Sequence, residues 1–172
     1  MWITFFGNME YISYLCRLFP PTYKSFCHVR ILSYLCSMKM NKTIFLKTNT
    51  QDLTLKKVKE ITSLTLMYCI AKFGVHKYKK VPTVSVINNP DRKYYGMFVC
   101  GTNKIVINRA HAFDVKLLVQ TILHEYTHYL QNMNEYKLVL KKVGYDKHPY
   151  EVEARNNEKH YTEVFKQLKQ LV

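Results

Sequence analysis

Residues 115–133 read VKLLVQTILHEYTHYLQNM, and their apolar side chains recur with the period of an α-helix. Two rows run along this helix: Leu118, Ile122, Tyr126 and Tyr129 in one, and Val119, Leu123 and Leu130 in the other. Asp114 immediately precedes the stretch and is a residue type that caps helix N termini. Because apolar side chains cover most of its girth, we expect this helix to be central and buried.

The same helix carries His124-Glu125-Tyr126-Thr127-His128, an HExxH motif. Residues four apart lie one above the other on a helix, so both imidazoles can reach one metal ion. Glu125 projects beside them, where a carboxylate can take a proton from metal-activated water. HExxH on a helix is typical of zinc peptidases. Burying two imidazoles and a carboxylate without a ligand would be costly, which favours a metal site over a purely structural role.

A catalytic zinc site uses three protein ligands and an open position, so a third ligand must come from elsewhere in the chain. The metzincin pattern requires glycine and histidine where this chain has Gln131 and Asn134, which excludes that pattern. Four downstream side chains remain as candidates: His148, His160, Glu151 and Glu153. The two glutamates lie on a third expected helix, which starts near Pro149 and runs almost to Val172. Glu153 fits an exposed charge on that helix better than a ligand.

After HExxH, the chain carries Glu151-Val152-Glu153-Ala154-Arg155. An HExxH helix followed by a helix with ExxA resembles the gluzincin layout of the ImmA/IrrE-type and M48-type metallopeptidases, and the resemblance covers about residues 50–172. It implies a zinc-dependent metalloendopeptidase that hydrolyses peptide bonds with one Zn²⁺ ion. The implied metal ligands are His124, His128 and Glu151, and the implied general base is Glu125. Both families usually carry Asp or Asn where this chain has Arg155.

Two other functions fit parts of the sequence. SprT-like proteases, which act on proteins bound to DNA, use a third histidine as ligand, and His148 would supply it here. A non-catalytic binding module could keep a zincin fold with its metal structural or absent. Arg155 lies one helical turn from Glu151 and could pair with it or with a substrate carboxylate, although a surface ion pair is the commoner outcome of such spacing. In an enzyme, any of three tyrosines could offer a phenol to an oxyanion: Tyr145, Tyr150 and Tyr161.

Before the HExxH helix we expect one other helix and three strands. That helix is capped by Asp52 and ended by Gly74. The predicted strands form an antiparallel meander with short turns: Thr83–Asn88, Tyr94–Val99 and Lys104–Asn108. A polar connection through Gly144 and Asp146 leads to the third helix. The predicted fold class is α+β, a minimal zincin-like domain with a small antiparallel sheet packed on the HExxH helix and a C-terminal glutamate-bearing helix.

The expected partner is a protein or peptide substrate. Zincins commonly bind substrate as an added strand at a sheet edge, and residues 104–108 are the expected edge. Lys104 at one end and Arg109 beyond the other would favour an acidic peptide. The chain has 26 Lys and Arg against 12 Asp and Glu, a net charge of +14, which also makes nucleic acid a candidate partner. A basic surface that only keeps the protein soluble is the commoner meaning of such a surplus.

Residues 1–49 form a predicted N-terminal appendage to the domain at 50–172, and nothing in them joins the resemblance. No stretch has the length and hydropathy of a transmembrane segment. The cysteines include no CxxC pair and favour a reducing compartment: Cys16, Cys27, Cys36, Cys69 and Cys100. We therefore expect a cytoplasmic protein, located in the host cytoplasm if the source is viral.

Overall fold

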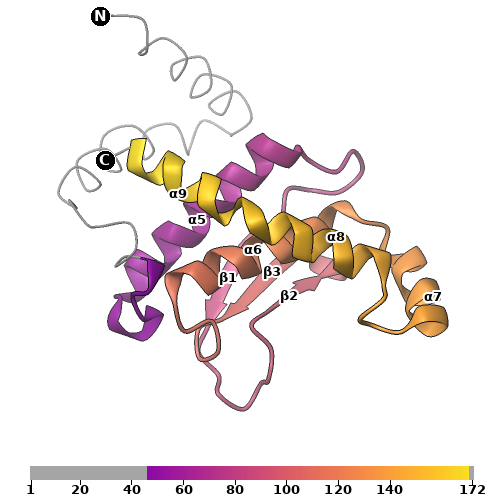
Figure 1. The fold of residues 1–172 in the computed structure, drawn as a ribbon, viewed down its shortest axis with the longest axis horizontal. Helices are drawn as coiled ribbons and strands as arrows, with labels where there is room; N and C mark the ends of the chain where they lie inside the picture. Colours follow the sequence, from indigo (N-terminus) through magenta and orange to yellow (C-terminus); the bar gives the residue numbers. More distant parts are fainter. Residues whose placement is uncertain (1–45, 171–172) are drawn as a thin grey trace, which may run out of the picture. The chain divides into compact units, whose positions relative to one another are not determined.

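The structure is a computed structural model that describes residues 46–170, with side chains described up to residue 166. The predicted appendage at 1–49 lies almost wholly outside the described residues. The elements from Thr50 to Gln167 belong to one compact unit (Figure 1). Within the described range, no helix is long and apolar enough to cross a membrane.

The first described helix, α5 (Leu55–Phe73), is capped by Thr54. The Thr54 side chain accepts a backbone hydrogen bond from the first turn at 3.3 Å. Asp52, the predicted cap, lies instead in a short 3-10 turn, η1 (Thr50–Asp52). The C-terminal end is as predicted, because Gly74 follows the helix with φ at +76°, a conformation that favours glycine.

The predicted central helix is α6 (Val115–Leu130). Asp114 caps it as expected, since its carboxylate accepts a hydrogen bond from the Leu117 backbone N–H at 2.6 Å. Both predicted rows contribute side chains with no exposed surface: Leu118, Val119, Ile122, Leu123, Tyr126 and Tyr129. The helix contacts α5 and two strands of the sheet, and a C-terminal helix also packs against it. The helix is therefore central and buried, as predicted from the apolar side chains that surround most of it.

The three strands form a mixed sheet, so the predicted antiparallel meander is wrong. The strands β1 (Thr83–Ile87), β2 (Gly96–Val99) and β3 (Lys104–Asn108) lie in the order β1-β3-β2. β3 pairs antiparallel with β2 and parallel with β1. It is consequently the central strand, which corrects the prediction that residues 104–108 form the sheet edge. The α+β class itself is confirmed.

The fully buried Asn108 accounts for this order. Its side chain accepts a hydrogen bond from the Asn89 backbone N–H at 3.0 Å and donates to the backbone oxygens of Asn89 and Arg92 at 2.7 and 2.9 Å. These bonds hold the loop after β1 across the end of β3, so the chain enters β2 on the far side of β3. Asn103, with φ at +48°, then turns β2 tightly back into β3.

β2 approaches α6 closely at Gly96. A Cβ atom added there would clash with Thr121 Cγ2 and lie 3.2 Å from Glu125 Cγ. We expect Gly96→Ala to lower the free energy of unfolding by about 1–3 kcal/mol, because β2 must move away from α6. Denaturant unfolding measures the loss, and Gly101→Ala is the control, since a Cβ at Gly101 meets nothing within 4 Å. Equal stability of the two variants would contradict the close approach.

The C-terminal part differs most from the prediction. The predicted polar connection to the third helix is preceded by a helix that was not predicted, α7 (Met133–Val143), which ends at Gly144. The predicted third helix is divided into three elements: α8 (Pro149–Asn157), the 3-10 turn η3 (Glu158–His160) and α9 (Tyr161–Gln170). α8 and η3 both pack against α6, and in Figure 1 the yellow ribbon of α8 and α9 passes across α6. This packing brings the α8 glutamates to the HExxH helix.

Glu163 ties α9 to α5. Its carboxylate accepts hydrogen bonds from the Tyr68 hydroxyl at 2.9 Å and from the Lys72 ammonium at 3.0 Å, and it lies 2.8 Å from His160 Nδ1. These contacts, led by His160, lower the pKa of Glu163 from 4.5 to about 2. A lowered carboxyl pKa stabilises the fold above the unfolded-state pKa, and this stabilisation is lost as the pH falls through the folded-state value.

We therefore expect Glu163→Gln to change the acid dependence of stability. The parent should be the more stable protein above about pH 4.5, and its advantage should shrink as the pH falls toward about 2. Denaturant unfolding of both proteins across this range is the measurement. An advantage that stays constant over the range would show that the Glu163 carboxyl does not titrate within it.

Candidate metal centre

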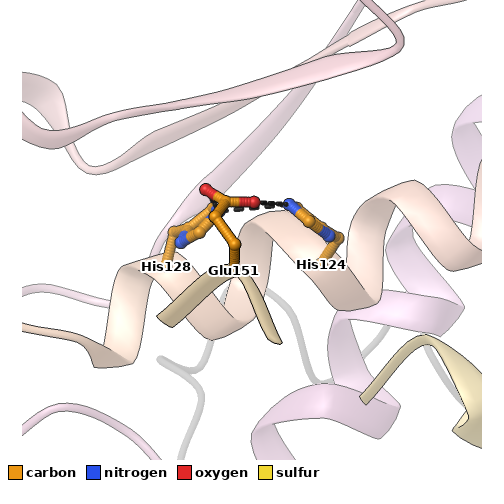
Figure 2. A group of neighbouring side chains, drawn as sticks. All are labelled: His124, His128 and Glu151. Carbon is orange, nitrogen blue, oxygen red and sulfur yellow. Dashed lines mark hydrogen bonds and ion pairs between the residues drawn. The ribbon is translucent and has the colours of Figure 1, made fainter. Parts of the chain in front are cut away.

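Three side chains from two helices converge at the C-terminal half of α6 (Figure 2). α6 supplies His124 and His128, and Glu151 comes from the first turn of α8. The two histidine Nε2 atoms are 3.1 Å apart. Glu151 Oε2 lies 3.4 Å from His124 Nε2, and Glu151 Oε1 lies 3.3 Å from His128 Nε2. The structure thus brings together the two motif histidines and one of the four candidate third ligands.

These separations are close to those of a zinc site. Zinc–nitrogen and zinc–oxygen bonds of about 2.0–2.1 Å, arranged tetrahedrally, place two ligand atoms about 3.3 Å apart. In the cluster the two Nε2 atoms are 3.1 Å apart, and each lies 3.3–3.4 Å from a different oxygen of the Glu151 carboxylate. One ligand atom from each residue lies within 4.8 Å of the others. Two imidazoles and one carboxylate are also the donor set of a common class of catalytic zinc site. The residues present therefore fit a zinc ion.

The Glu151 carboxylate is buried, with 1% of its residue surface exposed. Oε1 accepts a hydrogen bond from the Tyr136 hydroxyl at 2.7 Å, whereas Oε2 has no hydrogen-bond partner among the described residues. Burial raises the pKa of this carboxyl, but the neighbouring His124, His128 and Tyr136 side chains lower it by more, well below its usual range. An ionised, buried carboxylate whose Oε2 has the ion pair with His124 at 3.4 Å, but no hydrogen bond among the described residues, is a costly arrangement that a bound cation would relieve.

The outer nitrogen of each histidine is held by an acceptor. His124 Nδ1 lies 2.8 Å from Glu158 Oε1, and His128 Nδ1 lies 2.8 Å from Gln131 Oε1. The Gln131 amide in turn donates to Glu153 Oε2 at 2.8 Å. Since Nδ1 donates in both rings, the Nε2 atoms face the cluster as ligand atoms, which is how metal-binding histidines are commonly oriented.

The neighbouring carboxylates favour the protonated form of His124 when no metal is bound. Burial lowers its pKa, but the contacts with Glu151 and Glu158 outweigh burial and raise the pKa to about 9. A metal ion would replace this proton as the positive charge between the two carboxylates.

Glu125 lies beside the cluster on α6 with 8% of its surface exposed. Its Oε2 accepts a hydrogen bond from the Phe98 backbone N–H of β2 at 2.8 Å. Burial raises the pKa of Glu125, and it does so more strongly than the nearby His124 and His128 lower it. A raised carboxyl pKa brings the group closer to the range in which it can accept and return a proton near neutral pH.

The other candidate ligands are engaged elsewhere. His148 is fully buried as the N-cap of α8. Its Nδ1 accepts from the Tyr150 backbone N–H at 3.1 Å, and its Nε2 lies 2.9 Å from the Tyr136 backbone oxygen. His160 Nδ1 pairs with Glu163 at 2.8 Å. Glu153, an exposed side chain as expected, supports Gln131. The geometry therefore favours Glu151 over all three.

The three tyrosines that could donate a hydrogen bond to an oxyanion differ in where their hydroxyl groups lie. Tyr145 lies beside Glu151, and burial together with that carboxylate raises its pKa to about 12. The Tyr150 hydroxyl donates instead to Glu135 at 2.7 Å. The Tyr161 ring lies under the Lys116 ammonium at 4.9 Å. The half-exposed Tyr145 is thus the one of the three with its phenol at the cluster.

Arg155 forms a surface ion pair, the commoner outcome expected for it, and does not pair with Glu151. Its guanidinium lies 3.9 Å from the Asp146 carboxylate and 5.6 Å above the Tyr145 ring, rather than against Glu151. It therefore borders the cluster without neutralising its carboxylate.

Sequence reasoning missed three residues that shape the site: Tyr136, Gln131 and Glu158. A signal existed for two of them. Gln131 follows His128 by one helical turn, and Glu158 follows Glu151 by two turns, so each lies close to the motif by helical spacing. Tyr136 lies on α7, a helix that was not predicted, and nothing in its local sequence connects it to Glu151.

Glu158→Ala is expected to weaken zinc binding about 10- to 100-fold, because His124 loses the acceptor that orients its ring. Competition with a chromophoric chelator measures the affinity. Glu60→Ala on α5, outside the cluster, is the control with the same change in charge. Equal affinities of the two variants would show that Glu158 does not orient His124.

Comparisons with models of protein families, with curated proteins and with solved structures gave no match.

Proposed function

We propose that the protein is a zinc-dependent metalloendopeptidase. In this proposal His124, His128 and Glu151 hold one zinc ion, and Glu125 is the general base. The convergence of two Nε2 atoms on an ionised, buried Glu151 whose Oε2 has no hydrogen-bond partner among the described residues is the observation that carries it. The HExxH spacing on α6 adds support, because it places Glu125 next to this cluster.

A zinc ion bound there would supply Lewis-acid chemistry, polarising a peptide carbonyl and lowering the pKa of water. The chain's own residues would do the rest. Glu125 would accept a proton from the attacking water and return it to the leaving amine. The Phe98 N–H already holds Glu125 Oε2 at 2.8 Å, which leaves Oε1 for proton transfer. The Tyr145 hydroxyl would donate a hydrogen bond to the developing oxyanion.

Peptide hydrolysis is favoured over other hydrolytic reactions by the position of β2. This strand is one edge of the sheet and contacts Glu125 directly through Phe98. An extended peptide could therefore pair with the sheet beside the proposed base. The expected preference for acidic substrates is withdrawn, because β3 is central and the Arg109 Nη2 donates to the backbone oxygens of Gln51 and Leu53 at 2.8 and 2.7 Å.

The alternatives are weaker. A SprT-like protease requires a histidine as third ligand, and both nitrogens of His148 are engaged in the cap of α8. A non-catalytic zincin-fold module would keep the cluster but lack hydrolysis. A cytoplasmic location, in the host cytoplasm if the source is viral, belongs to the proposal and depends on the lack of paired cysteine motifs.

Cleavage of unfolded proteins tests this function. The full chain, loaded with one equivalent of zinc, is incubated with a panel of denatured proteins, and the products are identified by mass spectrometry. We expect fragments that disappear with a chelator and return when zinc is restored. Intact substrates across the panel, despite bound zinc, would contradict the protease and leave the non-catalytic module.

A further inference from the structure

β1 forms the edge of the sheet opposite β2. Its ladder with β3 starts with a hydrogen bond from Thr83 N to Asn103 O at 3.1 Å and ends with one from Arg109 N to Ile87 O at 2.8 Å. In a parallel ladder alternate residues face the partner strand, so Thr83, Ser85 and Ile87 face β3. The backbone N–H and C=O groups of Val84 and Val86 consequently point away from the sheet, toward its free edge.

This edge opens onto a groove of about 350 Å³. β1 contributes Val84, Ser85 and Val86 to its lining, and α5 contributes Lys59, Thr62 and Ser63. The groove thus combines strand backbone that has no partner among the described residues with apolar side chains and short hydroxyl side chains. These are the features with which an edge strand accepts an added strand.

The charge around the groove is positive. Lys59 is exposed on its α5 wall, and Lys80 and Lys104 are exposed near the start of β1, where Lys104 pairs with Thr83. None of the three ammonium groups has an ion pair with a described residue. An unpaired row of backbone groups beside unpaired lysines would attract an extended chain that carries carboxylates.

We propose that the β1 edge binds an extended, acidic peptide segment of a partner protein by β-strand addition. The backbone groups of Val84 and Val86 pair with the added strand, and Lys59 contacts its carboxylates. This site lies at the opposite sheet edge from the proposed zinc centre, so it is independent of whether the protein hydrolyses peptides.

Amide hydrogen exchange of the full chain, read by NMR, tests this pairing directly. The probe is a capped octapeptide of alternating glutamate and valine. We expect the Val84 and Val86 amides to exchange freely without it and to slow by about tenfold or more when it is added in excess. The Ser85 amide, already bonded to β3, should be protected in both states. Unchanged exchange at Val84 and Val86 would overturn the proposal.

Three further comparisons separate the added strand from other occupants. Lys59→Glu should weaken binding of the glutamate–valine peptide about tenfold, whereas Lys142→Glu on α7 should not. A lysine–valine octapeptide should not bind the parent. Val84→Pro should abolish binding while keeping the ladder, since the Val84 N–H points away from β3. Equal binding of the lysine peptide would overturn the acidic partner, and protection that rises with protein concentration without peptide would assign the edge to a second copy.

Discussion

Peptide hydrolysis by the zinc-loaded protein is expected to fall by about 10²–10⁴-fold in kcat/KM when Glu125 is replaced by glutamine. Glutamine has the shape of glutamate, and its carbonyl oxygen can still accept the 2.8 Å hydrogen bond from the Phe98 backbone N–H. It cannot accept a proton from water. The variant should therefore keep its fold and its zinc while losing the reaction.

The measurement pairs initial rates of cleavage of a fluorogenic peptide with zinc content from the same preparation. Glu60→Gln on α5 is the matched control, because it makes the same chemical change outside the centre. Full activity in Glu125→Gln would rule out the assigned general base. Loss of zinc together with activity would mean that Glu125 is needed for zinc binding rather than for proton transfer.

The second large effect is loss of the metal in Glu151→Ala. This change removes the only carboxylate that reaches both Nε2 atoms among the described residues, at 3.3 and 3.4 Å. We expect the variant to lose zinc on dialysis. Zinc at a free concentration 100 times its Kd should stabilise the parent by about 2.7 kcal/mol, and this stabilisation should be absent in the variant. Thermal unfolding with and without zinc measures it.

Glu153→Ala is the informative control, since this glutamate lies two residues further on and contacts Gln131 instead of the cluster. It should keep one equivalent of zinc. Zinc retained in Glu151→Ala would require a different third ligand. Zinc lost from both variants would point to general damage of α8 rather than removal of a ligand.

Local sequence was sufficient for α6 and for most of the site it carries. The helical period predicted its buried rows, Asp114 predicted its start, and the i, i+4 spacing predicted that His124 and His128 face one point. These inferences succeed because each depends on residues within a few turns of one helix. The parallel pairing of β1 with β3 depends instead on the buried Asn108, whose partners lie 16 and 19 residues away.

The sequence reduced the candidates for the third zinc ligand to a few residues but could not choose among them. Four side chains were available, and the choice depends on how the chain returns after α7. His148 is not available as a ligand because its side chain caps α8. A sequence pattern does not distinguish a capping histidine from a metal-binding one. α7 has no buried residue, but its apolar side chains Met133, Tyr136, Leu140 and Val143 recur at helical spacing, so its sequence did contain a helix signal. Tyr136 was missed together with the helix that carries it to Glu151.

The most direct test of the metal centre is zinc K-edge X-ray absorption on the full chain after loading with one equivalent and dialysis. We expect retained zinc surrounded only by nitrogen and oxygen, with the outer-shell scattering of two imidazoles. Failure to retain zinc, or sulfur from cysteine in the first coordination shell, would contradict a centre built from His124, His128 and Glu151.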